Sequence, residues 1–375
     1  MNYLDNAATT KPNSEVLNTL SNLYNKYFLN AHSPYTPALE LNEMQEQGRN
    51  KLAEILKVKS DELIYTSCGS ESNNMAIKGI AYKHLKNNKK HIITSMIEHS
   101  SVYECIKQLE EDGFEVTYLK PQSDGSINND DILDAIKDNT ILISIMKVNS
   151  ELGSINNVED IYDDIKAINK DIIVHSDCVQ ALGKLDIDLG KLDLASFSAH
   201  KINGLKGSGL LYKKAKVNLK SLITGGSQED NQRAGTSNYF FNILWTKTLR
   251  LYLEAKNIDS VNKRFEYAYN KLGDIESVHV NSSITNNSKF IINFSIPDYK
   301  SEVILNALEL KDILLSTKSA CSTNVKRSRV MDALPIDEKL KDSAFRISFD
   351  LDTSIEQIDS FIDSLNECLN QIKRG

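Results

Sequence analysis

The sequence predicts an α/β protein built on a wound, mostly parallel sheet of seven strands, with a smaller α+β domain beside it. The first observation is that short apolar runs alternate with longer stretches of helical periodicity from about residue 60 onward, which is typical of wound α/β folds. The second is the length of 375 residues, because a single hydrophobic core usually stops growing before that size. The seven expected strands cover residues 63–66, 91–95, 116–119, 141–146, 172–175, 194–198 and 209–212.

Four amphipathic stretches lie between these strands and are expected to form helices that cover both faces of the sheet. They cover residues 72–85, 101–111, 130–137 and 158–168. A long helical pattern over residues 242–272 follows the last expected strand of the sheet.

The rest of the chain has shorter elements and is expected to form the smaller domain. These elements are strands at 289–294 and 345–349 and a C-terminal helix from Ser354. We therefore predict a large domain of residues 13–257 and a small domain of residues 1–12 and 258–375.

Composition and charge exclude several classes of protein. The formal net charge is −7 with both signs interspersed, and no Lys/Arg block would follow a phosphate backbone, so we expect no direct nucleic-acid partner. No apolar run approaches the roughly 18 to 20 residues needed to cross a bilayer, and the N-terminus lacks a charged region followed by an apolar segment. We therefore expect a cytoplasmic protein that has no membrane partner.

The five cysteines are scattered without a Cys-x-x-Cys pair, which argues against a disulfide framework and against a structural zinc site. We expect no metal ion, and any thiol chemistry must come from a single cysteine. Cys321 is the candidate, because it lies among small and polar residues, whereas buried structural cysteines usually lie among apolar ones. With Lys318 nearby, this thiol would carry more thiolate and act as a nucleophile.

The most informative pair of residues is Asp177 and Lys201, each of which ends an apolar stretch that is expected to be a buried parallel strand. A lysine amine can bond to the aldehyde of pyridoxal phosphate, and a carboxylate against the pyridinium nitrogen keeps that ring protonated as an electron sink. Taken alone, either residue is more commonly a solvated surface charge. The residues that flank the pair favour a pyridoxal phosphate site.

Several other residues would surround such a cofactor. Gly69 and Ser70 lie between a predicted strand and a predicted helix, where unpaired backbone N–H groups bind phosphate, although Ser and Gly at such a place are also ordinary helix caps. His99 follows the next strand and is either a stacking or acid–base residue or a surface histidine that caps a helix. Gln180 either donates to the phenolic oxygen of the cofactor or begins a loop.

Two arginine-containing segments are also candidates. The Gly-rich loop of residues 225–236 holds Arg233 and Thr236, which suit phosphate or carboxylate binding, and the alternative is a flexible surface loop. The apolar residues that follow this loop favour an ordered role. Arg346, on a predicted strand, is suited to hold a carboxylate through two hydrogen bonds, and the alternative is a structural ion pair.

Together these segments resemble the cysteine desulfurases, pyridoxal phosphate enzymes of fold type I in the class V aminotransferase-like group. The likeness runs along the whole chain. Four motifs carry it: Tyr-Leu-Asp-Asn-Ala-Ala-Thr-Thr at residues 3–10, Glu98-His99, His-Ser-Asp-Cys-Val-Gln at 175–180 and Ser-Ala-His-Lys at 198–201.

The resemblance implies a role for each candidate residue. His99 would stack on the cofactor, Asp177 would contact its pyridinium nitrogen, and Lys201 would bond to its aldehyde. Gln180 would contact the phenolic oxygen, together with Ser150, which stands where the family usually has a second asparagine. The phosphate would be bound by Gly69, Ser70, Ser198 and His200, and Thr236 would reach the phosphate of the neighbouring subunit in a homodimer.

By the same resemblance, the reaction converts L-cysteine to L-alanine, and the sulfur is held as a Cys321 persulfide before it passes to an acceptor. Lys201 and His99 would move protons, and Arg346 would anchor the substrate carboxylate. The acceptor would be an iron–sulfur scaffold protein, a tRNA-thiolation enzyme or a sulfur carrier.

Two alternatives stay open. The first keeps the cofactor and changes the substrate, as in a selenocysteine lyase or another pyridoxal phosphate lyase. The second is a non-catalytic scaffold that binds a sulfur carrier, and it is motivated by departures from the family pattern such as Ser150 and Cys68, the latter in place of a usual glycine.

Overall fold

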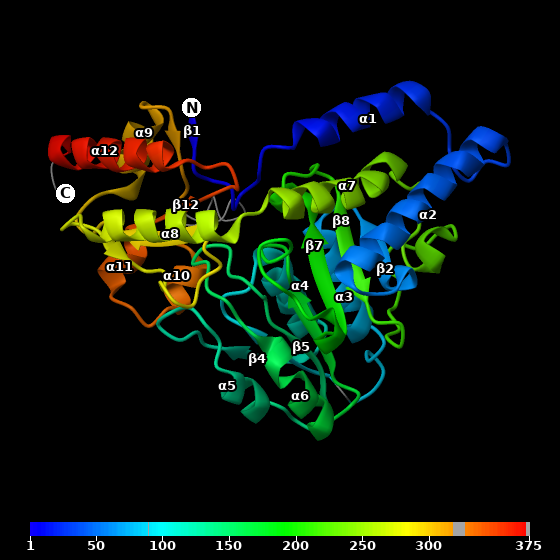
Figure 1. Ribbon diagram of the computed structural model, residues 1–375. Coiled ribbons are helices and arrows are strands. Elements are labelled where there is room, and N and C mark those ends of the chain that lie inside the picture. The colour runs from blue at the N-terminus through cyan, green and yellow to red at the C-terminus, as the bar shows by residue number, and fades with distance from the viewer. Residues whose placement is uncertain (89, 318–326, 373–375) are drawn as a thin grey trace.

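The computed structural model describes residues 1–88, 90–317 and 327–372, and a seven-stranded sheet forms the centre of its larger region (Figure 1). The strands are β2 (Leu63–Thr66), β3 (His91–Ser95), β4 (Glu115–Leu119), β5 (Thr140–Ser144), β6 (Ile173–Asp177), β7 (Leu194–Ser198) and β8 (Gly209–Lys213). Their order is β2-β8-β7-β6-β5-β3-β4. Strands β3 to β7 pair in parallel, whereas β8 is antiparallel to both of its neighbours. The predicted wound, mostly parallel sheet is confirmed.

Helices cover both faces of this sheet, because successive residues of a strand point to opposite sides. On one face, Ile92 and Leu142 pack in a core with α3 (Gly69–Ala81) and α4 (Ser100–Glu111). On the other face, Ile93 and Ile143 belong to a core that includes residues of α5 (Asn129–Asp134), α6 (Tyr162–Ile168) and α7 (Tyr239–Ala255).

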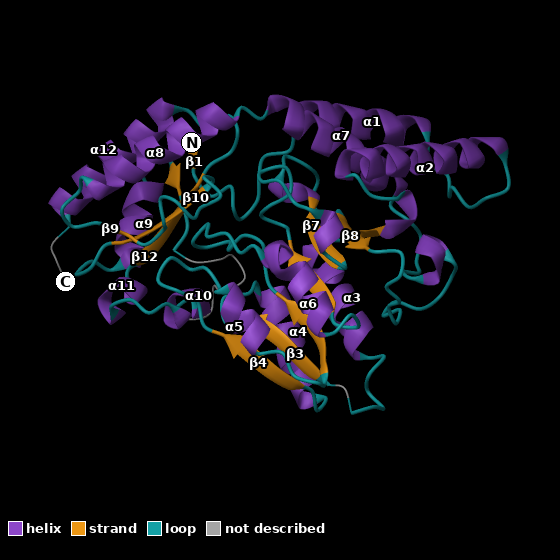
Figure 2. Cartoon of the chain, turned by 60° about the horizontal axis from the view of Figure 1, so that its bottom comes forward, coloured by secondary structure: helices purple, strands orange, loops and turns teal. Residues whose placement is uncertain are grey.

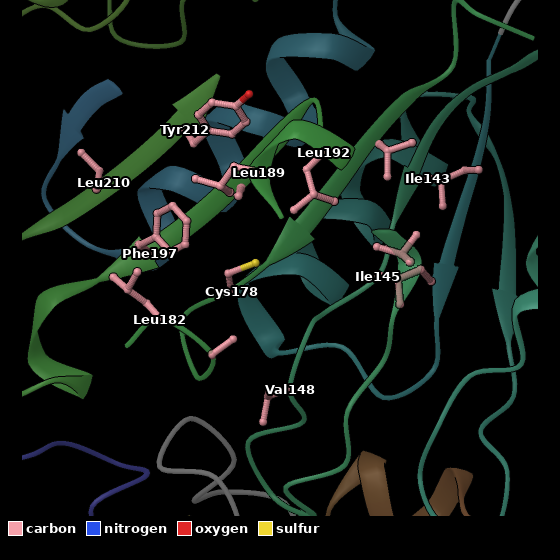
Figure 3. Close-up of a cluster of buried hydrophobic side chains, with 14 of the residues drawn as sticks. Ile143, Ile145, Val148, Cys178, Leu182, Leu189, Leu192, Phe197, Leu210 and Tyr212 are labelled. Carbon is pink, nitrogen blue, oxygen red and sulfur yellow. The ribbon is translucent and has the colours of Figure 1, made fainter. Parts of the chain in front are cut away.

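The second of these cores also contains the sulfur of Cys178 (Figure 3). This side chain lies close to Leu182 and Phe197, and burial raises the pKa of its thiol. A thiol with a raised pKa is mostly protonated and therefore a poor nucleophile. Cys178 is a structural residue, although it directly follows Asp177.

The helical pattern at 242–272 is not one helix, so the sequence expectation is wrong in this detail. The chain forms α7 up to Ala255 and then α8 (Ile258–Gly273), with extended backbone between them. The Asn257 side chain caps α8 by accepting a hydrogen bond from the backbone N–H of Ser260 (3.1 Å). Because asparagine is favoured at this position, it starts a new helix even though the apolar periodicity continues. The break carries α8 away from the large sheet towards the second region (Figure 1).

Two helices precede the first expected strand and were not predicted from the sequence. They are α1 (Ser14–Lys26) and α2 (Thr36–Leu56), and both lie beside α7 in Figures 1 and 2. Val16, Leu41 and Leu244 meet in their shared core. Several large apolar side chains of this part of the chain nevertheless stay exposed: Leu17, Tyr24, Phe28, Tyr35 and Leu39.

The second region has its own core and an antiparallel sheet of order β12-β10-β9. Its strands are β9 (His279–Val280), β10 (Ile291–Ser295) and β12 (Ala344–Ser348), and its longer helices are α8, α9 (Ser301–Glu309) and α12 (Ile355–Gln371). Strand β1 (Asn2–Tyr3) joins this region through parallel pairing with β11 (Ile313–Leu314), and Leu4 belongs to the same core. The domain boundaries at residues 13 and 258 stay a prediction.

The remaining elements are short. They are α10 (Arg329–Ala333), α11 (Glu338–Asp342) and the 3₁₀ turns η1 (Ser60–Glu62), η2 (Val158–Ile161), η3 (Leu189–Lys191), η4 (Ala199–Lys201) and η5 (Gln228–Asn231). Within the part of the chain that the structure describes, none of the helices has the length and apolar character needed to cross a membrane.

Candidate active site

A cavity of about 180 Å³ lies at the carboxyl ends of β6 and β7, where ligand sites of open α/β sheets form. It brings together most of the residues that the sequence singled out: Gly69, Ser70, His99, Ser150, Asp177, Gln180, Ser198, His200, Lys201 and Arg346. Thr236 does not line this cavity and lies exposed in the loop after η5. Cys321 and the neighbouring Lys318 lie outside the described residues.

Asp177 is the last residue of β6, and its carboxylate is buried and firmly oriented. The exposed fraction of the residue is 5%. One carboxylate oxygen accepts a hydrogen bond from the Asn73 amide (2.8 Å), and the other accepts one from the backbone N–H of Val179 (3.0 Å). Because both donors are fixed by secondary structure or by a tight turn, the carboxylate presents one edge to the cavity.

Lys201 ends η4, directly after β7, and reaches back to the N-terminal segment. Its Nζ donates to the carbonyl oxygens of Ala7 (2.5 Å) and Ala8 (2.7 Å). The amide of Gln180 also donates to the Ala7 oxygen (2.9 Å) and accepts from Lys184 Nζ (3.0 Å). Burial lowers the pKa of Lys184 to about 8. These contacts make residues 7 and 8 part of the wall of the cavity.

His99 both caps α4 and lines the cavity, so the two interpretations of the sequence are compatible. Its Nδ1 lies 3.2 Å from the backbone nitrogen of Ser101, which donates to it, and 2.8 Å from the Ser101 hydroxyl. Burial lowers the pKa of His99 and outweighs the opposite effect of the Asp177 carboxylate, and the positive charges of Lys201 and Arg329 also lower it. The imidazole is therefore neutral at pH 7.

Arg346 projects from β12 of the second region into the same cavity and is almost fully buried. One guanidinium nitrogen contacts Asp5 (2.6 Å), and another donates to the backbone carbonyl of Ser150 (2.8 Å). Among the described residues, the Nε atom has no hydrogen-bond partner. The side chain thus forms a structural ion pair and also lines the cavity.

The opposite end of the cavity suits an anion. Gly69 begins α3, so its backbone N–H belongs to the first turn, where such groups have no partner within the helix. A Cβ at Gly69 would lie 2.8 Å from a methyl carbon of Val179, so only glycine fits without displacement. The hydroxyl of Ser198 is buried and has no partner in the described part of the chain. His200 contacts Thr9 Oγ1 (3.1 Å), and burial and the neighbouring Lys201 lower its pKa to about 3.

Comparison with known proteins explains this arrangement. The family model for aminotransferases of class V matches residues 2–361. The chain belongs to this family. A protein named cysteine desulfurase IscS from Dictyoglomus turgidum is 37% identical to it over 99% of this chain and 95% of that protein.

Solved structures show the same relationship. A NifS-like protein has a TM-score of 0.90 and 32% identity, and the match covers 99% of each chain. A structure described as SspA in complex with cysteine has a TM-score of 0.81 and 33% identity over 93% of this chain and 99% of that chain. The fold type I architecture with its mostly parallel sheet follows from these likenesses and from the observed topology.

Pyridoxal phosphate is the cofactor of this member of the class V aminotransferase family, and the described residues fit it. The buried Ser198 hydroxyl without a protein partner and the first turn of α3 suit its phosphate. The Asp177 carboxylate, held by two donors, suits the pyridinium nitrogen. Lys201 lines the same cavity, so its amine suits the aldehyde of the cofactor.

Sequence reasoning missed two polar residues of the site in this family member, Asn73 and Ser101, and both line the cavity. Asn73 follows Gly69 by four residues on α3, and residues four apart share one face of a helix. That spacing is the signal that could have found it. Ser101 follows His99 by two residues at the start of α4, and no sequence pattern distinguishes it from an ordinary capping serine.

Proposed function

We propose that this chain is a cysteine desulfurase that converts L-cysteine to L-alanine and keeps the sulfur as a persulfide on Cys321 for transfer to an acceptor. The observation that carries the proposal is the convergence of Lys201, Asp177, His99 and Arg346 on one cavity. It occurs in a chain that matches a protein named cysteine desulfurase along nearly its whole length.

Each cofactor-facing residue has a physical reason for its role. When bound, pyridoxal phosphate withdraws electrons from the substrate carbon that carries the amino group. Asp177 would hold the proton of the pyridinium nitrogen, and Lys201 would bond to the aldehyde and move a proton between substrate carbons. His99 would stack on the ring, and Gln180 and Ser150 would contact its phenolic oxygen. Gly69, Ser70, Ser198 and His200 would bind the phosphate.

Arg346 is the proposed anchor of the substrate carboxylate. An arginine can hold a carboxylate through two parallel hydrogen bonds, and burial strengthens such a contact. Because Asp5 already occupies one nitrogen, the substrate carboxylate competes with Asp5 or uses the nitrogen atoms that remain. Fixing the carboxylate orients the substrate sulfur towards the thiolate that takes it, which is the proposed role of Cys321.

We further propose a homodimer in which Thr236 contacts the phosphate in the neighbouring subunit. Thr236 is exposed and does not line the cavity of its own chain, which suits a contact across an interface. The exposed apolar side chains of α1, α2 and the segment between them, such as Phe28 with an exposed fraction of 89%, would be buried by a second copy.

A cytoplasmic location is proposed on the state of the cysteines. Disulfides are rare in reducing compartments. The four described cysteines are all unpaired: Cys68, Cys105, Cys178 and Cys368.

We propose an iron–sulfur scaffold, a tRNA-thiolation enzyme or a sulfur carrier as the acceptor of the sulfur. Labelled sulfur from cysteine, traced into each purified candidate, would distinguish among them.

The central test is sulfide release from L-cysteine in the presence of a thiol reductant. We expect the purified protein with pyridoxal phosphate to be yellow and active. Cys321→Ala should keep the colour and lose sulfide release. The matched control is Cys368→Ala on α12, a buried cysteine outside the cavity, and it should keep both.

Other outcomes would point to other functions. A faster reaction with selenocysteine than with cysteine, independent of Cys321, would indicate a selenocysteine lyase. A protein that binds no cofactor and releases no sulfide, but captures a sulfur carrier, would be a scaffold. Borohydride reduction followed by peptide mapping should place the pyridoxyl group on Lys201, and its absence there would contradict the proposed cofactor chemistry.

A further inference from the structure

A continuous chain of hydrogen bonds joins Asp177 to His99 through two residues that the proposed reaction does not use. The amide nitrogen of Asn73 lies 2.8 Å from Asp177 Oδ2 and 2.9 Å from the hydroxyl oxygen of Ser101. The Ser101 hydroxyl oxygen lies 2.8 Å from Nδ1 of His99. Asp177 ends β6, Asn73 lies on α3, Ser101 lies in the first turn of α4 and His99 is the N-cap of α4, so regular secondary structure and a helix cap set the geometry.

The Asp177 carboxylate, at one end of this series of hydrogen bonds, sets the direction of the others. The NH₂ group of Asn73, rather than its oxygen, faces Asp177 and donates to the carboxylate oxygen Oδ2. Both amide hydrogens are then in use, one towards Asp177 and one towards Ser101. Asn73 has an exposed fraction of 1%, so water does not compete for these contacts.

The same reasoning sets the proton position on the histidine. Because the Ser101 oxygen accepts from Asn73, the hydroxyl hydrogen is available to donate to His99 Nδ1. The backbone N–H of Ser101 donates to the same nitrogen (3.2 Å). A neutral imidazole has one N–H and one acceptor nitrogen. Since Nδ1 accepts, the proton of neutral His99 is on Nε2.

We propose that Asn73 and Ser101 are positioning residues that hold neutral His99 in the Nε2–H form, so that His99 presents a hydrogen-bond donor at Nε2. In this form the ring takes up a proton only at Nδ1, which requires the hydrogen bond from the Ser101 backbone N–H to break and the Ser101 hydroxyl to reverse its role from donor to acceptor. The burial that lowers the pKa of His99 favours the neutral ring. The role of this tautomer in catalysis rests on the proposed function, whereas the position of the proton on His99 does not.

The test is ¹⁵N NMR of the full-length protein with pyridoxal phosphate added, labelled at the histidine ring nitrogens. The His99 signals are assigned by their loss in His99→Gln. In the wild type at neutral pH, we expect His99 Nδ1 to be unprotonated and Nε2 to be protonated. Ser101→Ala keeps only the backbone donor, so we expect the ratio of the two tautomers to shift by about 2- to 10-fold towards Nδ1–H.

The other variants separate positioning from a general effect on the helix. Asn73→Ala should shift the ratio in the same direction, because the hydroxyl then loses the donor that favours its orientation towards Nδ1. The double variant should shift it no further than Ser101→Ala alone, since both changes act through one hydroxyl. Ser100→Ala removes the neighbouring hydroxyl, which does not line the cavity, and should leave the His99 signals unchanged. Ser101→Thr keeps a hydroxyl and should restore the wild-type signals.

Two results would overturn the proposal: a wild-type His99 that carries its proton on Nδ1, or a Ser101→Ala spectrum that matches the wild type and Ser100→Ala. The Asn73→Ala variant gives an independent measurement if Ser101→Ala does not fold. No turnover is needed for these spectra. A failed sulfide assay would therefore count against the proposed function and leave the tautomer result in place.

Discussion

The ion pair between Arg49 on α2 and Glu229 in η5 offers a quantitative test of how this fold is held together. Both oxygens of Glu229 accept from the guanidinium, at 2.8 and 2.9 Å. Arg49 also donates to the carbonyl of Leu63 (2.7 Å), and the backbone N–H of Tyr65 donates to Glu229 (2.9 Å). The side chains are 11% and 4% exposed, so the pair is almost withdrawn from water.

Replacing Arg49 by methionine leaves the Glu229 carboxylate buried with the Tyr65 N–H as its remaining donor. Breaking a buried ion pair in this way destabilises a protein by about 3 to 5 kcal/mol. Glu229, Asp230 and Asn231 all have positive φ, at 47°, 52° and 65°, which is unfavourable for residues other than glycine. This loop can therefore relax outward and hydrate the carboxylate, so we expect the lower end, about 3 kcal/mol.

The assay is urea unfolding at one fixed protein concentration, with and without pyridoxal phosphate. The matched control is Arg250→Met, which breaks an Arg–Glu pair with Glu254 at the same 2.8 Å distance, but with side chains that are 52% and 56% exposed. Exposed pairs contribute roughly 0.3 to 0.5 kcal/mol. If Arg49→Met and Arg250→Met destabilise the protein equally, burial does not decide the strength of these pairs and the reasoning is refuted.

Three other substitutions test contacts in and near the cavity. Ser198→Ala removes a buried hydroxyl that has no partner in the described residues, so we expect unchanged or slightly higher thermal stability but roughly tenfold weaker pyridoxal phosphate binding by absorbance titration. Burial raises the pKa of Glu98 to about 8. The folded state prefers neutral Glu98, so its contribution to the free energy of unfolding is complete below the unfolded pKa of about 4.3 and is lost as the pH rises through about 8. Glu98→Gln does not titrate, so its free energy of unfolding, measured with urea, should fall less over this pH range. Gly209→Ala would place a Cβ 2.5 Å from the backbone of Cys68 and should lower the free energy of unfolding by about 3 kcal/mol. Gly113→Ala, whose Cβ would meet no atom within 4 Å, should lower it by about 1 kcal/mol.

Each of these expectations has a clear contrary result. A loss of thermal stability in Ser198→Ala without weaker cofactor binding would mean that the hydroxyl has a structural role. Parallel pH profiles for the wild type and Glu98→Gln would show that Glu98 titrates at its ordinary value. Equal effects of the two glycine substitutions would show that the backbone near Cys68 can move aside.

The sequence by itself determined the sheet, because each of its strands is a local apolar run whose pattern needs no partner to be recognised. It also located Asp177, Lys201 and Gly69, since each lies where a strand ends or a helix begins. The helices α1 and α2 are not predicted, because their apolar patterns are not recognisable without their packing partners. Their cores form against α7, more than 180 residues later in the chain, so their apolar faces have a meaning only after folding.

Only the tertiary structure decided how the site is completed. Asn73 and Asp177 are 104 residues apart, and Arg346 and Asp5 are 341 apart, yet each pair is in hydrogen-bond contact. No local pattern encodes these contacts, because they depend on how the sheet, its covering helices and the second region pack together. The types of chemical group are therefore local properties of the sequence, whereas their orientation, burial and proton positions are set by packing between distant segments.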